Sequence, residues 1–143
     1  LTRWIELEVL PAALHYGLGV IPWSPLHGGL LSGALRKERD GGGSRSGKGR
    51  SSEGLEEHRD TIEEWEKLCA DLGEDPAHVG LAWLLSREGV TAPIVGPRTQ
   101  EQLDGTLRAL EIELSEETLE ALDELFPPPG PHGAKPAPEA YAW

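Results

Sequence analysis

Leu18-Gly-Val-Ile-Pro-Trp23 and Pro93-Ile-Val-Gly96 are the two short apolar stretches that decide the fold. Each ends abruptly in turn-forming and polar residues, Ser24-Pro-Leu-His-Gly28 after the first and Pro97-Arg-Thr99 after the second. Helical patterns separate the two stretches, and tight turns cannot join parallel strands. The sequence therefore predicts an α/β fold with two parallel strands and flanking helices.

The expected helices are marked by capping residues at their starts and by glycine or proline at their ends. The stretch from Arg36 to Arg50 is instead predicted to belong to a long connection, because its centre is rich in Gly and Ser. The expected helical segments are Glu6 to Tyr16, Thr61 to Leu72, a helix from Asp75-Pro76 that Gly89 closes, Thr99 to Leu110, and a helix to Leu125 that Ser115 caps.

Composition and charge exclude several classes of partner and of site. The chain has 143 residues and a formal net charge of −12, which argues against nucleic acid or an anionic membrane as a partner. Cys69 is the single cysteine, so no intrachain disulfide is possible and a cytoplasmic protein is expected. No apolar run is long enough for a membrane span, and no His or Cys spacing is typical of a metal site. Because the sequence starts at Leu1 and lacks Met, we expect an amino-terminal part to precede it.

The two strand ends favour an anion site. At the carboxyl end of a parallel strand and at a helix amino end, backbone N–H groups point at the same place, and glycine lets the main chain approach a phosphate closely. Two common phosphate motifs are not matched. Gly42 to Gly49 lacks the Ser/Thr and the preceding strand of a Walker A loop, and Gly17-Leu-Gly19 precedes a strand instead of following one. The sequence thus predicts half of a dinucleotide site.

Three ordered motifs resemble the carboxyl-terminal half of an aldo/keto reductase. They are Trp23-Ser-Pro-Leu26 followed by Gly29-Leu-Leu-Ser-Gly33, then Val79-Gly-Leu-Ala-Trp-Leu-Leu85, then Pro93-Ile-Val-Gly-Pro-Arg98 with Gln102. The similarity is greatest to the bacterial branch that also resembles potassium-channel β subunits. It implies that residues 1–126 are part of a (β/α)₈ TIM barrel, its last two β/α units, and that 127–143 form a Pro-rich carboxyl-terminal tail. A full barrel usually needs about 250 residues, so the missing amino-terminal half is an implied partner.

The resemblance also implies NADPH-dependent reduction of an aldehyde or ketone, with a small carbonyl compound as substrate. The first turn would contact the nicotinamide ribose and pyrophosphate, and the second would hold the adenosine phosphate. A planar guanidinium binds phosphate oxygens with two parallel hydrogen bonds, so Arg98 would favour NADPH over NADH. The implied cofactor-binding residues are Trp23, Ser24, Pro25, Leu26, His27, Gly28, Arg45, Gly96, Arg98 and Gln102.

Several of these positions have a second interpretation. Gln102 stands three residues after Thr99 and forms a capping box with it, and His27 could be a solvent-facing turn residue. The connection around Arg45 could be a mobile belt over the pyrophosphate or a solvated loop, and the tail could cover the barrel mouth or be disordered. Gly105 stands where the family often has an acidic residue.

The family's catalytic Asp, Tyr, Lys and His would lie in the first half of the barrel, so no catalytic residue is expected here. Neither Tyr16 nor Tyr141 has a lysine and an acid at suitable spacing. Three functions remain open: the cofactor half of an NADPH-dependent reductase, a noncatalytic nucleotide-binding or redox-sensing subunit, and an inactive truncated remnant. An upstream sequence with or without the catalytic tyrosine would distinguish the first two.

Overall fold

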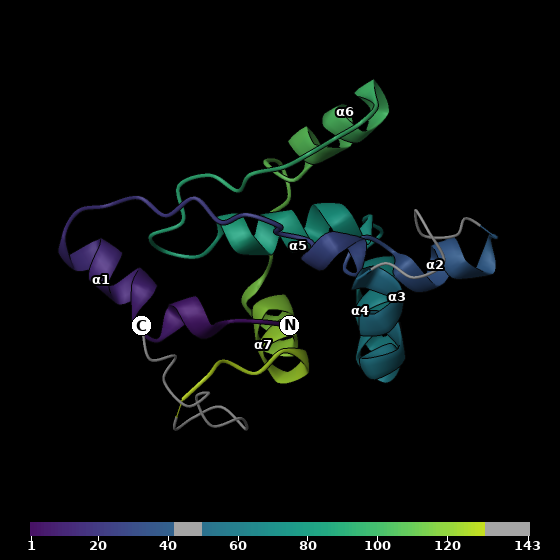
Figure 1. The fold of residues 1–143 in the computed structure, drawn as a ribbon, viewed down its shortest axis with the longest axis horizontal. Coiled ribbons are helices and arrows are strands. Elements are labelled where there is room, and N and C mark those ends of the chain that lie inside the picture. The colour runs from purple at the N-terminus through teal and green to yellow at the C-terminus, as the bar shows by residue number, and fades with distance from the viewer. Residues whose placement is uncertain (42–49, 131–143) are drawn as a thin grey trace.

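The computed structural model describes residues 1–41 and 50–130, with the backbone alone for residues 50–53. In Figure 1, α5 (Pro76–Leu85) lies between α6 (Gln100–Arg108) above and α4 (Arg59–Asp71) and α7 (Glu116–Leu125) below. α5 contacts α4 and α6, and α4 also contacts α7. The remaining elements are the 3-10 turns η1 (Trp4–Glu6) and η2 (His27–Gly29) and the helices α1 (Val9–His15), α2 (Ala34–Arg39) and α3 (Arg50–Glu57).

The two expected strands are not formed as strands within these ranges. Their place is taken by one isolated parallel bridge between Val20 and Val90. Two hydrogen bonds form it: the Val20 N–H donates to Gly89 O, and the Thr91 N–H donates to Val20 O, both at 2.9 Å. Further along, the Ile94 N–H donates to Pro22 O at 2.8 Å. The segments therefore run side by side and parallel, as predicted, but the ladder is short.

Proline explains part of this shortfall. Pro22 and Pro93 lie inside the expected strands and have no N–H to donate, so each interrupts the ladder. A parallel pair also depends on neighbouring strands and on covering helices for its stability. Leu18, Ile21 and Ile94 are each more than half exposed, which shows that these segments lack such cover. The part of the chain that the structure describes is thus helical, and a two-stranded piece of barrel was the wrong expectation for its local structure.

The three helix starts predicted in the second half of the chain are confirmed. Asp75 accepts a hydrogen bond from the Ala77 N–H at 2.9 Å and Thr99 accepts one from the Gln102 N–H at 3.2 Å. Ser115 caps α7 through the Thr118 N–H, also at 3.2 Å. Each cap satisfies a helix N–H that would otherwise lack a partner.

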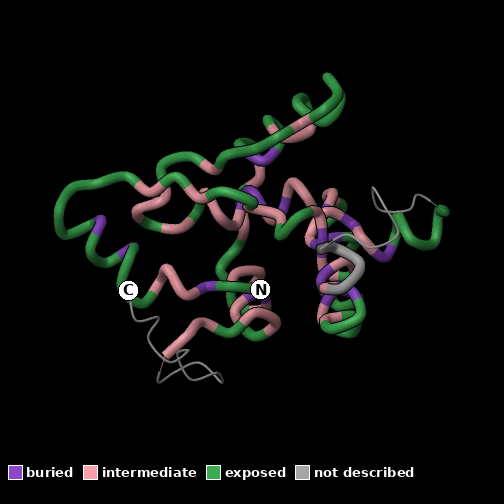
Figure 2. The backbone as a smooth tube through the Cα atoms, in the orientation of Figure 1, coloured by how far each residue is buried: buried purple, intermediate pink, exposed green. Residues whose placement is uncertain are grey.

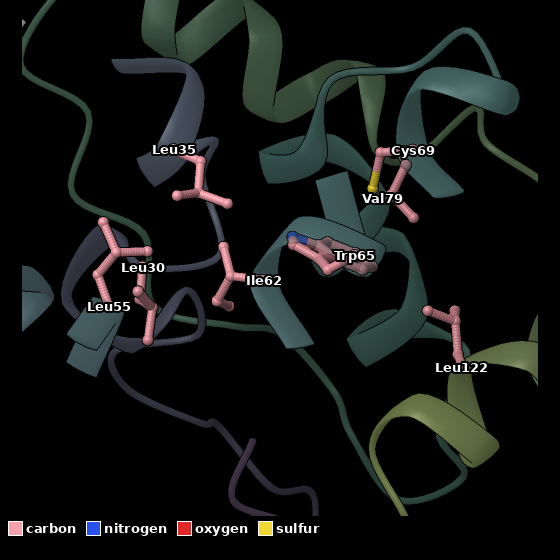
Figure 3. Packing of buried hydrophobic residues seen from close by; sticks show 8 residues of the cluster. All are labelled: Leu30, Leu35, Leu55, Ile62, Trp65, Cys69, Val79 and Leu122. Carbon is pink, nitrogen blue, oxygen red and sulfur yellow. The ribbon is translucent and has the colours of Figure 1, made fainter. Parts of the chain in front are cut away.

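The main core surrounds Trp65 of α4. Its buried members, drawn in Figure 3, are Leu30, Leu35, Leu55, Ile62, Trp65, Cys69, Val79 and Leu122. The Trp65 ring meets Phe126 edge to face with centroids 5.9 Å apart, and its indole N–H donates to Leu31 O at 3.2 Å. This one side chain therefore connects α4 to the segment before α2 and to the end of α7.

Arg3 ties the start of the chain to α7. Only 7% of the residue is exposed, and its guanidinium binds both carboxylate oxygens of Glu6 at 2.6 and 2.8 Å. It also donates to Asp123 at 2.6 Å and to the carbonyl of Phe126 at 2.7 Å. These partners satisfy a charge that would be costly to bury alone.

Many large apolar side chains are exposed. Figure 2 shows exposed residues of all types in green along the backbone. The exposed apolar side chains belong mainly to the two paired segments, to α1 and to α6. An apolar surface of this extent is typical of a face that another part of a protein covers. The exposed side chains on these elements include Val9, Leu14, Tyr16, Leu18, Ile21, Trp23, Ile94, Val95, Leu103 and Leu107.

Asp75 is expected to make stability depend on pH. Burial by itself would raise the pKa of this carboxyl, but hydrogen bonds from the Arg36 guanidinium and the Ala77 N–H outweigh burial and hold the pKa below its ordinary value of 3.8. Because the pKa of Asp75 is lower in the folded than in the unfolded chain, its carboxylate stabilises the fold at pH values above the unfolded pKa. This stabilisation is lost as the pH falls through the folded pKa. Unfolding by urea between about pH 6 and pH 2 should therefore show a smaller acid loss in Asp75→Asn.

Asparagine keeps the capping oxygen, so this variant isolates the charge of residue 75. Asp71→Asn is a matched control, because Asp71 is exposed at the end of α4. An unchanged acid profile in Asp75→Asn would contradict the assignment.

Candidate functional site

The first candidate turn has an unusual backbone. The Ser24 carbonyl accepts from the His27 N–H at 3.0 Å, which closes a β-turn with Pro25 at its second position, and the Ser24 hydroxyl accepts from the Gly28 N–H at 3.3 Å. Within the described ranges, Ser24 (φ 52°) and His27 (φ 48°) are the two non-glycine residues with positive φ. Such conformations cost about 1–3 kcal/mol each and concentrate at binding sites.

Two leucines hold this strained turn in place. Leu26 packs against the small cluster of Leu81, Ala82 and Ala109, which joins α5 to the end of α6. Leu30 is completely buried in the main core. The turn between them is therefore anchored on both sides, while the ring of Trp23 is 74% exposed beside it.

The second candidate turn leads into α6. The Gln102 side-chain oxygen accepts from the Arg98 N–H at 2.8 Å, while the Gln102 N–H donates to Thr99. The Thr99 half of the predicted capping box is thus confirmed, whereas the Gln102 side chain accepts from the N–H of Arg98 and not from that of Thr99; its amide NH₂ remains for another partner. A Cβ atom placed on Gly96 would meet nothing within 4 Å, so the main chain there faces open space.

The Arg98 guanidinium makes no hydrogen bond or ion pair with any residue of 1–41 or 50–130. It stands at the amino end of α6, where the helix dipole is positive. Two positive features next to each other, without an anion, favour binding of a negatively charged ligand.

The parallel pairing relates the two turns. Ile94 donates to Pro22, so Ser24 follows this hydrogen bond by two residues along one segment and Arg98 by four along the other. Both turns therefore leave the same end of the pair. Ser24 and Arg98 are not hydrogen-bonded to each other, and a site shared by the two turns stays a prediction.

The basic segment before α3 differs from expectation. Arg36 and Arg39 lie in α2 and not in a loop: Arg36 pairs with Asp75 at 2.6 Å and Arg39 with Glu66 at 3.7 Å. Glu66 also accepts from the N–H groups of Leu35 and Arg36 at 2.7 and 3.0 Å, which caps the start of α2. Arg45 and the near match to a Walker A loop at 42–49 lie outside the described residues.

Other features do not point to a second reactive centre in the part of the chain that the structure describes. Two hollows lie away from both turns, one between α4 and α7 and one beside α2 and α4. No group of three His, Cys, Asp or Glu residues there could hold a metal. Burial raises the pKa of the Cys69 thiol to about 12, which makes it a core residue and a poor nucleophile.

Tyr16 does not have the surroundings of a proton donor. It is 73% exposed at the end of α1 and meets His15 edge to face, with ring centroids 4.8 Å apart. Its hydroxyl has no hydrogen-bond partner among the described residues. Tyr141 and the rest of the tail from residue 131 lie outside these ranges, and no described helix is long and apolar enough to cross a membrane.

Comparisons with known proteins agree with these features. The aldo/keto reductase family model matches residues 1–126. An uncharacterized oxidoreductase of Bacillus subtilis, YrpG, is 49% identical over all 143 residues, which cover 41% of its own length. The NADH-specific methylglyoxal reductase of Escherichia coli is 32% identical over 81% of this chain and 36% of its own length. A putative voltage-gated potassium channel subunit beta of Schizosaccharomyces pombe is 32% identical over 85% of this chain and 38% of its own length.

Proposed function

The chain belongs to the aldo/keto reductase family, and we propose that it supplies the cofactor-binding half of an NADPH-dependent reductase of aldehydes or ketones. The chain spans about two fifths of the length of the curated relatives that it matches. The complementary part of the barrel, which would carry the catalytic Asp, Tyr, Lys and His, is then its partner, and residues 1–126 are the barrel portion. A cytoplasmic location is consistent with the single buried thiol.

The unpaired guanidinium of Arg98 is the observation that carries this proposal. In a chain of net charge −12, this exposed cation at the positive end of a helix is available to bind an anion. A phosphate on the adenosine ribose fits this donor, because a guanidinium can give it two parallel hydrogen bonds. The exposed main chain at Gly96 leaves room for the same group.

The other candidate residues would serve both ends of the cofactor. The strained turn would present the Ser24 hydroxyl and the backbone around His27 and Gly28 to the ribose and pyrophosphate, and Trp23 would border the ring. Gln102 keeps an amide NH₂ for adenine while its oxygen caps α6. NADPH, when bound, supplies the hydride for carbonyl reduction. The chain's own residues bind and orient, and the proton donor comes from the complementary part.

A noncatalytic nucleotide-binding or redox-sensing subunit is the second candidate. The similarity to the potassium channel subunit beta of Schizosaccharomyces pombe favours it. This candidate shares the cofactor site and differs in the absence of turnover. An inactive remnant is the third, and the exposed apolar side chains over the paired segments favour it. It predicts neither cofactor binding nor turnover.

Cofactor binding is the direct test. NADPH should quench tryptophan fluorescence of the 143-residue chain, and part of the quench should vanish in Trp23→Phe while the Kd stays within about three-fold, because Trp23 borders the site without an ionic contact. The same titration is made on a chimera in which these 143 residues replace the matching segment of the Bacillus subtilis relative.

Turnover by that chimera tests whether these 143 residues serve as the cofactor half when the relative supplies the catalytic half. Carbonyl-dependent oxidation of NADPH supports this role, whereas a catalytic Asp, Tyr, Lys and His in the residues that precede Leu1 would favour the reductase over the noncatalytic subunit. If neither protein binds NADPH, the proposed site is wrong.

A further inference from the structure

Two glycines lie inside helices at the places where other elements come closest to them. Gly80 is in the middle of α5 and Gly105 is in the middle of α6. Glycine is unfavourable in a helix interior compared with alanine, so its presence there needs a reason. Close approach of a neighbouring side chain is such a reason.

At Gly105 the neighbour is the imidazole of His78 from α5. A Cβ atom on Gly105 would lie 2.7 Å from His78 Nε2, which is closer than a Cβ approaches another atom, and 3.4 Å from its Cε1, which is an ordinary contact. The bare face of α6 at Gly105 thus receives His78. This contact joins α5 to the helix that Arg98 precedes and whose first turn holds Gln102.

At Gly80 the neighbour is Leu26 of the first candidate turn. A Cβ on Gly80 would lie 3.2 Å from Leu26 Cδ2 and 3.7 Å from Trp65 Cζ2, so the leucine is wedged against the bare face of α5. The next two residues of α5, Leu81 and Ala82, complete the pocket around Leu26. The strained turn therefore leans on α5 at this glycine.

We propose that α5 is the spacer that sets the two halves of the cofactor site, with the Gly80–Leu26 contact positioning the nicotinamide and pyrophosphate turn and the His78–Gly105 contact positioning the adenosine-phosphate helix. His78, Gly80 and Gly105 are assigned as positioning residues, because their contacts join α5 to α6 and to Leu26 and do not involve the Ser24 hydroxyl or the Arg98 guanidinium. The proposal rests on the proposed function. It adds that affinity for the two ends of the cofactor is set by two separate packing contacts on one helix, as the central place of α5 in Figure 1 allows.

The test uses ligands that represent each end. Adenosine 2′,5′-bisphosphate and reduced nicotinamide mononucleotide are titrated, with NADPH, into the 143-residue chain and into the Bacillus subtilis chimera. Gly105→Ala should raise the Kd of the adenosine ligand about five-fold and leave the nicotinamide ligand within about two-fold, because the added methyl displaces α6 alone. Gly80→Ala should do the reverse.

A second substitution identifies the contact. His78→Ala in the Gly105→Ala background should restore the affinity for the adenosine ligand, because it removes the atoms that the new methyl meets. Equal weakening of both ligands by either glycine variant would overturn the proposal. So would an unchanged or tighter adenosine ligand in Gly105→Ala, since alanine by itself improves the helix.

Thermal unfolding tests the steric contact between Gly105 and His78 without any ligand. The effects of Gly105→Ala and His78→Ala on Tm should be non-additive, and additive effects would also overturn the spacer. If the wild-type protein binds none of the three ligands, the proposed function fails. If the wild type binds them but each glycine variant weakens both half-ligands equally, only the proposed role of α5 as a spacer is refuted.

Discussion

Replacement of Trp65 by alanine is expected to lower the free energy of unfolding by about 3–5 kcal/mol, the range for truncating a buried aromatic side chain. Trp65 is 2% exposed and lies at the centre of the main core (Figure 3). Its loss leaves a cavity between α4 and its neighbours and leaves Leu31 O without the indole N–H. Domains of this size are stable by only about 5–15 kcal/mol, so the loss is a large part of the total and should raise the unfolded population by roughly two to four orders of magnitude.

Cys69 supplies the measurement. The thiol is completely buried in the same cluster, and its raised pKa of about 12 keeps it as the unreactive thiol at pH 8. Reaction with an aromatic disulfide reagent should be slow in the wild type, fast in Trp65→Ala and fast in urea for both. Trp23→Ala is the matched control, because Trp23 is 74% exposed and its removal should cost less than about 0.5 kcal/mol. A slow thiol in Trp65→Ala would contradict this description of the core.

Local signals explain which helices the sequence predicts. Asp75, Thr99 and Ser115 each cap a helix through an N–H two or three residues later, so the whole interaction is written within one turn of sequence. The start of α2 depends instead on Glu66, which lies about thirty residues further along and supplies the capping oxygens. No local pattern shows that partner, so the sequence predicts a connection where α2 forms.

The prediction of two strands is wrong because strand formation depends on residues outside the two segments. Leu18 to Trp23 and Pro93 to Gly96 have the composition of buried strands, but a strand is formed with its neighbours and not by its own sequence. Here the described neighbours provide one bridge, and Pro22 and Pro93 donate nothing. The family match at residues 1–126 and the share of 41% of the Bacillus subtilis relative suggest where the neighbours are: in the remaining part of the barrel.

The candidate site divides in the same way. The turn at Pro25 and the Thr99–Gln102 cap are readable from residue type and spacing. The positive φ of Ser24 and His27 is not, because Ser and His rarely adopt it without tertiary contacts. The contact of Gly105 with His78 joins residues twenty-seven positions apart, and an interior glycine was its only sequence signal.

Arg98→Ala is expected to weaken NADPH about 10- to 100-fold and NADH by less than about three-fold, because charge-assisted hydrogen bonds to a phosphate contribute about 1.5–3 kcal/mol and NADH lacks the 2′-phosphate. Arg98→Lys keeps the charge and loses the planar fork, so its NADPH affinity should lie between those of wild type and Arg98→Ala. Fluorescence titration of the Bacillus subtilis chimera with both cofactors gives the two dissociation constants.

Arg59→Ala separates a local contact from the effect of net charge. Arg59 is an exposed arginine that pairs with Glu38 at 3.0 Å on α4, away from both turns, so its loss changes the charge of the protein by the same amount. NADPH affinity should change little in this variant. The family contains a relative that is NADH-specific by name, so both cofactors are titrated in each variant. Equal weakening of NADPH and NADH in Arg98→Ala would assign the guanidinium to the pyrophosphate, which both cofactors share, and would refute a role in recognising the 2′-phosphate.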